Sequence, residues 1–354
     1  MKTIILTGGG TAGHITPNLA LLPALKEQYQ NIIYIGSGQH LETDLLKNYP
    51  YVKYHSVPTI KFKRAFSFEN LKIPFVLFKG IKEAKKIIKQ YNPDVIFSKG
   101  GYVALPVVLA GAKLKVPMVA HESDLTLGLA NKLVKNKFKT ICTTFKQTAE
   151  KLKNGVYTGA PLTQQIMHNN PQNFKKQFNI TSNKPILLVL GGSQGALQIN
   201  QLIENNLEVL TKDYYIVHIC GKDKLNKNIS NPNYLQLEFY NNMGCLYACT
   251  SLCITRGGSN TIFELLYNHI PMLIIPLQNG SRGDQVANAK YFEKHNYALA
   301  LYKKEITNAD FLTMYNTLKQ RQKLIMYSTK DIQPENTIFK IIKEINAAAN
   351  KKTR

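Results

Sequence analysis

Three glycine-rich loops recur in this chain of 354 residues, each placed after an apolar run and before a helical pattern. The β-branched and apolar run 3–7 leads into GGGTAGH, after which an apolar periodicity indicates a helix. The same pattern restarts in the second half, where the apolar run 185–190 leads into GGSQGA. A third loop, at 256–261, also follows a strand-like run. Repeated strand–loop–helix units predict parallel sheets covered by helices on both faces.

The other apolar runs extend this pattern into two similar halves. Those that predict strands are 31–35, 95–97, 118–120, 215–219, 252–255 and 272–275. Helical periodicity is clearest at 79–90 and, near the end of the chain, at 336–349. The polar, asparagine-rich segment 167–184 is expected to link the halves. We therefore predict an α/β protein with two Rossmann-like domains.

The first loop fits a dinucleotide-binding pattern only in part. Gly8, Gly10 and Gly13 satisfy G-x-G-x-x-G, in which a pyrophosphate lies on the helix N-terminus. Such sites also need an acidic residue at the end of the second strand to bind ribose. Here that strand ends in Gly-Ser-Gly and the first acid afterwards is Glu42, which disfavours a dinucleotide site. His14, at the start of the following helix, is a candidate for catalysis or ligand contact.

The other two loops have the chemistry of phosphate binding. In GGSQGA, backbone amides and the Ser193 hydroxyl are suited to phosphate, but the Gly-Lys-Ser/Thr ending of an ATPase loop is absent. The third loop opens a helix that carries Glu264, whose carboxylate suits a ribose diol. Three such loops indicate a ligand that contains a diphosphate. Because the sequence has no D-x-D and no H-E-x-x-H, we expect helix N-termini rather than a metal to stabilise the diphosphate.

Basic charge dominates the composition, with 45 Lys and Arg against 22 Asp and Glu and a formal net charge of +23. The densest basic stretch, 60–90, interleaves lysine with phenylalanine, as is typical of surfaces that dock on an anionic membrane. Two alternatives are a nucleic-acid surface that stacks bases on the rings, and a buried set of phenylalanines beneath a solvated basic face. A nucleic-acid partner would leave the phosphate loops unexplained, so none is expected. The residues expected to associate with the membrane are Lys61, Phe62, Lys63, Arg64, Phe66, Phe75, Phe78, Lys79 and Lys82.

Several classes of protein are disfavoured. No apolar run is long enough for a membrane-spanning helix, and the N-terminus has too short an apolar region for a secretory signal. The five cysteines are an odd number without metal-ligand spacing, so we expect buried thiols rather than a disulfide framework or a metal site. These features predict a protein that works at the cytoplasmic side of the membrane.

Six motifs resemble those of one enzyme family, and they occur in the same order. They are GGGTAGH, PDVIFSKGGYVALPVVLA, HESD with GLANK, GGSQGA, ITRGGSNTIFE and PLQNGSRGDQVANA. The chain resembles the bacterial peptidoglycan lipid-intermediate N-acetylglucosaminyltransferases, the MurG family, which have the GT-B fold of two Rossmann-like domains facing across a cleft. The resemblance implies an N-terminal acceptor and membrane-association domain at 1–160 plus 336–354. It also implies a C-terminal UDP-GlcNAc-binding domain at 161–335.

The resemblance implies an inverting transfer of GlcNAc from UDP-GlcNAc to the 4-hydroxyl of MurNAc in undecaprenyl-diphospho-muramoylpentapeptide (lipid I). The product would be lipid II, used for peptidoglycan synthesis in cell-wall growth, cell shape and division. The expected partners are UDP-GlcNAc, lipid I and an anionic membrane surface, with no cofactor. Two alternatives share the fold: a UDP-GlcNAc epimerase, which needs no lipid acceptor, and another GT-B lipid glycosyltransferase.

The resemblance also implies roles for individual residues. His14 is the candidate general base, and Glu122 is a second candidate catalytic residue that would orient a partner or the acceptor. The residues expected to bind substrate are Thr11, Ala12, Gly13, Ser193, Gln194, Tyr240, Ser259, Asn260, Thr261, Ile262, Phe263, Glu264, Gln285 and Asn288. Residues 11–13 would line the acceptor side, and the Tyr240 backbone would face the uracil.

The resemblance also implies which part of the donor each residue binds. Ser193 and its neighbours would bind the diphosphate, Glu264 would bind the ribose, and Gln285 and Asn288 would bind the GlcNAc hydroxyls. Two positions depart from the family pattern: Thr163 stands where many relatives carry a donor-contacting arginine, and Asp124 stands where some have asparagine.

Overall fold

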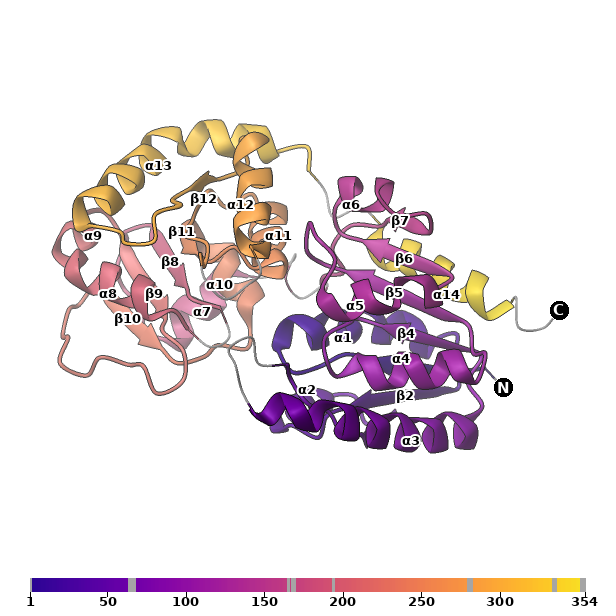
Figure 1. The fold of residues 1–354 in the computed structure, drawn as a ribbon. Helices are drawn as coiled ribbons and strands as arrows, with labels where there is room; N and C mark the ends of the chain where they lie inside the picture. Colours follow the sequence, from indigo (N-terminus) through magenta and orange to yellow (C-terminus); the bar gives the residue numbers. More distant parts are fainter. Residues whose placement is uncertain are drawn as a thin grey trace. The chain divides into compact units, whose positions relative to one another are not determined.

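The chain forms two α/β units, each built on a parallel sheet (Figure 1). The computed structural model describes residues 2–62, 68–163, 166, 170–192, 195–278, 283–332 and 336–350. The N-terminal unit comprises 1–163 with 335–354, and the C-terminal unit comprises 164–334. Both sheets have the strand order of a doubly wound fold, so the predicted fold class of two Rossmann-like domains is confirmed.

The N-terminal unit contains seven strands in the order β3-β2-β1-β4-β5-β6-β7. The strands are β1 (Thr3–Thr7), β2 (Asn31–Gly36), β3 (Val52–Ser56), β4 (Val95–Ser98), β5 (Met118–Glu122), β6 (Thr140–Thr143) and β7 (Gly155–Tyr157). The helices are α1 (Ala12–Lys26), α2 (His40–Leu46), η1 (Phe68–Lys72), α3 (Ile73–Tyr91), α4 (Ala104–Lys113), α5 (Leu129–Val134), η2 (Lys135–Lys137), α6 (Lys146–Glu150) and α14 (Thr337–Asn350). The strand order reverses between β1 and β4, so the loops that follow these two strands lie where ligands bind in open α/β sheets.

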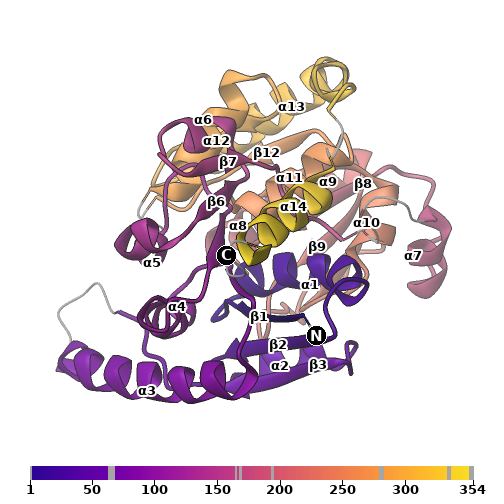
Figure 2. The ribbon, with the colours of Figure 1, turned by 90° about the vertical axis from the view of Figure 1, so that its right-hand side faces the viewer.

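Both faces of this sheet are buried, which is why the middle residues of β1 and β4 are apolar on both sides of the strand. On one face Ile4 and Leu6 of β1 form a core with α1, α2 and α14. On the other face Ile5 forms a core with α3, α4 and the segment around α5. Figure 2 shows α14 near α1, although the two helices are far apart in the sequence. The last helix of the chain therefore belongs to the core of the N-terminal unit.

The C-terminal unit contains six strands in the order β10-β9-β8-β11-β12-β13. They are β8 (Ile186–Leu190), β9 (Tyr215–Ile219), β10 (Tyr234–Leu237), β11 (Thr250–Thr255), β12 (Met272–Ile274) and β13 (Leu299–Ala300). The helices are α7 (Pro171–Gln177), α8 (Leu197–Asn205), α9 (Leu207–Asp213), α10 (Met243–Cys249), α11 (Ser259–Tyr267), α12 (Asp284–Lys294) and α13 (Asn308–Thr329). Here the order reverses between β8 and β11, so the second and third glycine loops share this switch point.

The segment 167–184, which was expected to link the halves, contains the helix α7. The Asn170 side chain caps this helix by accepting a hydrogen bond from the Gln172 amide at 2.9 Å. Pro171 occupies the first turn, where its fixed φ favours a helix start. Phe174 is completely buried and anchors the helix. A capping residue and one apolar anchor thus outweigh the polar composition of the segment.

Five short strands were not predicted: β3, β6, β7, β10 and β13. The partly exposed strands β3, β7 and β10 lack the continuous apolar run that marks the central strands. The helix expected at 79–90 begins earlier, at Ile73. Among the helices that the structure describes, none combines the length and the apolar character needed to cross a bilayer.

Candidate functional site

The first glycine loop turns sharply from β1 into α1. Gly10 has a φ of 81°, a left-handed conformation that glycine adopts without strain. A Cβ atom added to Gly8 would lie 2.6 Å from the His14 carbonyl oxygen, so the loop passes too close to α1 for a side chain there. The carbonyl of Gly8 accepts a hydrogen bond of 2.7 Å from the buried Tyr34 hydroxyl. The backbone of this loop is therefore held in one conformation.

His14 lies in the first turn of α1, directly after this loop. Its Nδ1 is 2.8 Å from the Thr11 hydroxyl oxygen, and its backbone amide donates to the Thr11 carbonyl at 3.1 Å. In the tautomer that donates from Nδ1 to Thr11, the ring carries its lone pair on Nε2. Thr11 thus orients the ring, and Nε2 is the nitrogen that takes up a proton in this tautomer. Ala12 and Gly13, which complete the predicted acceptor loop, occupy the first turn of α1 beside His14.

The loop after β4 packs on the loop after β1. Gly100 and Gly101 have φ values of 82° and 79°, and a Cβ on Gly101 would lie 3.3 Å from His14 Cγ. The ring of Tyr102 covers Gly10, where an added Cβ would be 2.4 Å from the ring. The KGGY motif and the GGGTAGH motif, distant in sequence, are therefore neighbours at the switch point of the N-terminal sheet.

Glu122, at the end of β5, has its carboxylate engaged within its own loop. It is 6% exposed and accepts hydrogen bonds from the Gly128 amide at 2.8 Å and the Asn131 side chain at 2.9 Å. A third bond, of 3.2 Å, comes from the amide of Asp124. These contacts fold residues 124–131 over the end of β5. Glu122 therefore holds this loop, and its role as a second catalytic residue stays a prediction.

A buried lysine lies close to this loop and was not singled out from the sequence. Lys99 is 2% exposed, and its ammonium donates to the Ser123 hydroxyl at 2.7 Å. Burial lowers the pKa of Lys99, while the nearby carboxylates of Glu122 and Asp124 raise it. His121 is completely buried beside this cluster, and burial lowers its pKa well below the usual value, so the ring is neutral. These groups join the ends of β4 and β5.

In the C-terminal unit, the second glycine loop connects β8 to α8. Gly195 has a φ of 69°, and a Cβ there would lie 2.0 Å from the Cys220 carbonyl oxygen. This approach ties the loop to the end of β9. Ser193 and Gln194, the residues predicted for the diphosphate, lie outside the described residues.

The third loop leads into α11, which begins at Ser259. Asn260 and Thr261 complete the first turn, where amide groups and the positive end of the helix dipole suit an anion. Ile262 is completely buried and the Phe263 ring packs edge-on against Phe292 at 5.2 Å. These two side chains are buried in the core, so we expect a ligand to contact the backbone of these residues.

Glu264 follows on the same helix and is partly buried. The hydroxyl of Tyr247, from α10, donates a hydrogen bond of 2.7 Å to its carboxylate. Burial raises the pKa of Glu264 to about 7, although the bond from Tyr247 opposes this shift. Tyr247 itself is buried. The carboxyl predicted to bind ribose is therefore oriented by a tyrosine that sequence patterns did not reveal.

Side chains from the first two turns of α12 form hydrogen bonds to the third loop and to the segment after β12. Asn288 is completely buried and donates to the Gly257 carbonyl at 3.1 Å. The Gln285 side chain accepts from the Leu277 amide at 2.8 Å. Arg256, which begins the loop, donates to the Ile275 carbonyl at 3.0 Å. Asn288 thus holds the loop, and its contact to the sugar stays a prediction.

Tyr240 follows β10, and its side chain packs on α7. Its hydroxyl donates to Gln177 at 3.0 Å, and its ring meets Phe174 edge-on at 5.2 Å. The side chain is therefore used for packing. This is compatible with the expectation that the Tyr240 backbone, and not its side chain, faces the uracil.

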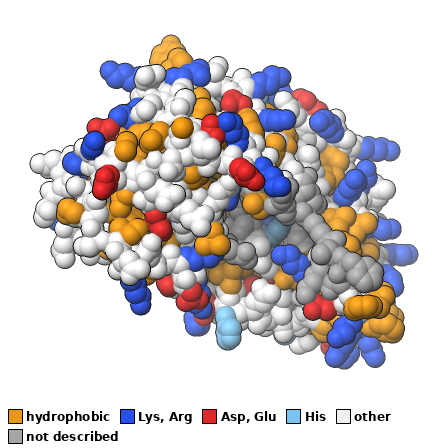
Figure 3. Space-filling view, turned by 60° about the vertical axis from the view of Figure 1, so that its left-hand side comes forward, with side chains coloured by type: hydrophobic (Ala, Val, Ile, Leu, Met, Phe, Trp, Pro, Cys, Tyr) orange, Lys and Arg blue, Asp and Glu red, His pale blue; other side chains and the backbone are white. Residues whose placement is uncertain are grey.

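Four of the residues expected at a membrane, Phe75, Phe78, Lys79 and Lys82, lie on α3. Phe75 is 79% exposed and Phe78 is 70% exposed, so they are not core residues. Lys79 and Lys82 are exposed on the same face of α3, because they follow Phe75 and Phe78 at helical spacing. Lys61 and Phe62 are exposed before this segment, whereas Lys63, Arg64 and Phe66 lie outside the described residues. Figure 3 shows hydrophobic side chains next to Lys and Arg at the lower right of the surface.

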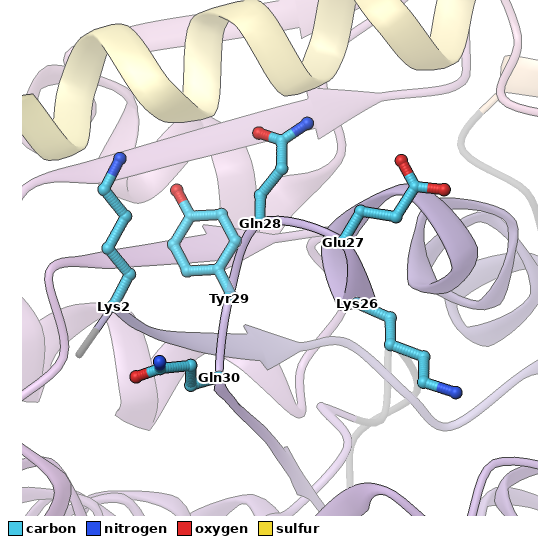
Figure 4. A pocket seen from close by; sticks show the side chains of 6 residues that line it. All are labelled: Lys2, Lys26, Glu27, Gln28, Tyr29 and Gln30. Carbon is cyan, nitrogen blue, oxygen red and sulfur yellow. The ribbon is translucent and has the colours of Figure 1, made fainter.

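One cavity lies away from these loops. It has a volume of about 290 Å³ and is lined by Lys2, Lys26, Glu27, Gln28, Tyr29 and Gln30 (Figure 4). These residues precede β1 and β2, at the amino edge of the sheet, opposite to the edge where ligands bind in this fold. In the described part of the chain, no group of three or more His, Cys, Asp or Glu could hold a metal ion.

Two family models match most of the chain. The glycosyltransferase family 28 N-terminal domain matches residues 4–143, and the glycosyltransferase family 28 C-terminal domain matches residues 186–348. The chain belongs to glycosyltransferase family 28. The family resemblance inferred from the motifs is thereby confirmed.

Two relatives of this chain carry the same name. The chain is 42% identical over 346 residues to the UDP-N-acetylglucosamine–N-acetylmuramyl-(pentapeptide) pyrophosphoryl-undecaprenol N-acetylglucosamine transferase of Clostridium tetani, covering 96% of both chains. The enzyme of that name from Lachnospira eligens is 40% identical over 347 residues, covering 97% of this chain and 98% of the relative.

Solved structures show the same fold at lower identity. MurG of Acinetobacter baumannii has a TM-score of 0.72 at 22% identity, covering 98% of this chain and all (100%) of that one. The UDP-GlcNAc 2-epimerase of Neisseria meningitidis, bound to UDP-GlcNAc, has a TM-score of 0.69 at 13% identity, covering 98% and 100%. At these identities the likeness concerns the fold alone, the GT-B arrangement of two Rossmann-like domains.

Proposed function

We propose that this chain transfers GlcNAc from UDP-GlcNAc to the 4-hydroxyl of MurNAc in lipid I, with inversion, to give lipid II. The observation that carries the proposal is the identity of 40–42%, over nearly the full length, to transferases of that name. The glycine loops at both switch points are consistent with a substrate that contains a diphosphate. The role in peptidoglycan synthesis, and so in cell shape and division, follows from this product.

The donor is assigned to the C-terminal unit. The first turn of α11 and the second glycine loop, including Ser193, would bind the diphosphate through amides and hydroxyls. Glu264, oriented by Tyr247, would in its ionised form accept hydrogen bonds from both ribose hydroxyls. We keep Gln285 as a contact to the sugar and assign Asn288 to holding the loop, because its side chain is buried against Gly257.

The acceptor is assigned to the N-terminal unit, with His14 as general base. As the 4-hydroxyl of MurNAc attacks C1 of GlcNAc, its proton passes to His14 Nε2 and a new C1–O4 bond forms. The C1–O bond to the diphosphate breaks, and UDP leaves with the electron pair. Amides and helix N-termini at the glycine loops would stabilise the negative charge of the departing UDP. Thr11 orients the base, and Glu122 is a positioning residue for the loop at 124–131.

Incubation with radiolabelled UDP-GlcNAc tests this proposal directly. One reaction contains a soluble lipid I analogue and the other contains no acceptor. We expect label to enter the lipid product only in the first reaction, with release of UDP. Conversion of UDP-GlcNAc without an acceptor would instead favour an epimerase, and label on diacylglycerol but not on lipid I would favour another lipid glycosyltransferase.

We also propose that η1 and α3 dock on the anionic cytoplasmic face of the membrane. Phe68, Leu71, Phe75 and Phe78 are 70–79% exposed. Exposing such an apolar surface to water is unfavourable, and surfaces of this kind mark sites of contact with a protein or a membrane. Lys79 and Lys82 lie beside them on α3, and each basic residue near an anionic surface contributes about 1 kcal/mol. The opposite side of α3 is buried at Gly80, Ala84 and Ile88. Peripheral attachment would bring the enzyme to a lipid-linked acceptor.

Vesicle sedimentation tests the docking surface. The variant Phe75→Ser/Phe78→Ser should bind vesicles of phosphatidylglycerol and phosphatidylcholine more weakly than the wild type. Phe339→Ser on α14 is a matched control, because Phe339 is 68% exposed but lies on another helix. Equal loss of binding in both variants would contradict a specific role for α3.

A further inference from the structure

Glu42 is an acid that neither the proposed reaction nor the family match uses. It lies on α2, just beyond the carboxyl end of β2, and is completely buried. A buried carboxylate is costly unless hydrogen bonds or charges compensate it. Its surroundings therefore indicate what it does.

Four hydrogen bonds converge on this carboxylate. Oε1 accepts from the Gly10 amide at 3.3 Å and from the Ser37 hydroxyl at 2.7 Å. Oε2 accepts from the Ser37 amide at 2.6 Å and from the Tyr54 hydroxyl at 2.7 Å. All of these donors are amides and hydroxyls, the groups with which glycine loops bind a phosphate.

The backbone around Glu42 is shaped to its carboxylate. A Cβ atom added to Gly9 would lie 2.1 Å from Oε1, and one added to Gly36 would lie 2.2 Å from Oε2. Tyr54 extends the same network, because its hydroxyl accepts from the Gly38 amide at 2.7 Å. The glycines after β1 and β2 thus leave space for an internal carboxylate as well as for a turn.

We infer that Glu42 is the resident anion of the first glycine loop and that it positions Thr11 and His14. The carboxylate occupies the anion site formed by Gly10, Ser37 and Tyr54, so the Gly10 amide is not open to a phosphate. By holding the Gly10 amide, Glu42 fixes the residue next to Thr11, whose hydroxyl contacts His14 Nδ1 at 2.8 Å. Its effect on His14 as a base rests on the proposed transferase function.

The isosteric variant Glu42→Gln tests the positioning role. Its amide nitrogen must face hydrogen-bond donors, so the loop loses at least one acceptor without a change in volume. We expect kcat to fall about tenfold or more while the KM for UDP-GlcNAc and the affinity for UDP stay within about twofold. The control is Asp44→Asn, which removes a charge from the same helix at a side chain that is 58% exposed, and should leave kcat unchanged.

A second variant tests the anion site itself. Glu42→Ala would leave the donors on Gly10, Ser37 and Tyr54 facing an empty space of carboxylate size. Sodium formate should then restore part of kcat in Glu42→Ala, whereas sodium chloride at equal ionic strength should not. Formate should have no such effect on Glu42→Gln, in which the amide fills the space. Absence of rescue in a folded Glu42→Ala variant would overturn the inference that the site binds an anion.

Hydrogen exchange separates this inference from the proposed reaction, because it needs no substrate. Glu42→Gln should speed amide exchange in peptides that contain residues 8–12 and leave the C-terminal unit unchanged. If exchange changes in this way but the wild type transfers no sugar, the loop role stands and the transferase proposal fails. If kcat and exchange both match those of Asp44→Asn, or if UDP affinity falls together with kcat, the inference is overturned. If Glu42→Gln does not fold, Tyr54→Phe removes one donor, and an unchanged kcat in that variant would overturn it.

Discussion

Replacement of Glu264 by glutamine removes a carboxyl group that burial holds in an unfavourable environment when ionised. Burial raises its pKa from 4.5 to about 7. In the unfolded chain the same carboxyl is solvated and ionises at its ordinary pKa. Because the folded-state pKa is raised, the contribution of this group to stability is fully present below about pH 4.5 and is lost as the pH rises through 7.

The size of the effect follows from the shift. A difference of about 2.5 pKa units corresponds to about 3 kcal/mol, which is an upper limit because Glu264 is only partly buried. The glutamine variant has no such titration and still accepts the hydrogen bond from Tyr247. We expect Glu264→Gln to exceed the wild type in stability by less than about 1 kcal/mol at pH 5 and by up to about 3 kcal/mol at pH 8.

Urea unfolding between pH 5 and 8.5 measures this difference, with the free energy of unfolding compared at each pH. Glu305→Gln serves as a control at an exposed glutamate and should give a difference that does not vary with pH. The comparison between wild type and variant removes the contribution of all other titrating groups. A stability difference for Glu264→Gln that is equal at pH 5 and pH 8 would refute the reasoning that burial raises this pKa.

Binding of UDP-GlcNAc should show the opposite trend with pH. A ribose diol prefers the ionised carboxylate, so affinity should rise as Glu264 ionises and level off above its pKa of about 7. At one pH unit below that pKa, affinity should be about tenfold weaker than the plateau. The diphosphate of UDP-GlcNAc does not titrate in this range, so calorimetry reports the protein. A flat profile would contradict the role of Glu264 in ribose binding.

Three further predictions concern the base, the donor site and the membrane surface. His14→Ala should lower kcat by about 10²- to 10⁴-fold with the KM for UDP-GlcNAc unchanged in steady-state kinetics, and normal turnover would exclude His14 as the base. Tyr247→Phe removes a hydrogen bond that lowers the pKa of Glu264, so the pH profile of UDP-GlcNAc affinity should move to higher pH, and an unmoved profile would disprove this coupling. Lys79→Gln/Lys82→Gln should weaken vesicle binding at low salt about thirtyfold and reduce its salt dependence, whereas unchanged binding would assign these charges no role at the membrane.

Local patterns in the sequence were enough for the central strands and the loops that follow them. A strand buried on both faces needs a continuous apolar run, as residues 4–6 of β1 and all of β8 show. The edge strands β3 and β10 are partly exposed, so they lack the continuous apolar run that predicts a buried strand. The helix at 171–177 depends on its cap and on Phe174, and its polar composition gave no strong helical pattern. The exposure of Phe75 and Phe78 was also undecided, because lysine and phenylalanine alternate in both a buried and a docking helix.

The sequence by itself determined the doubly wound fold, the three glycine loops and the residues that surround them, because these depend on neighbours along the chain. The tertiary structure decided which side chains support the loops from a distance. In the sequence, Glu42 is the first acid after β2 but lies too far along the chain for the ribose-binding position. Only the folding of α2 onto the loop brings its carboxylate to the Gly10 amide. Tyr247 reaches Glu264 from another helix, and Asn288 is buried beneath Gly257. Such contacts join positions far apart in sequence, and no pattern along the chain encodes their distance.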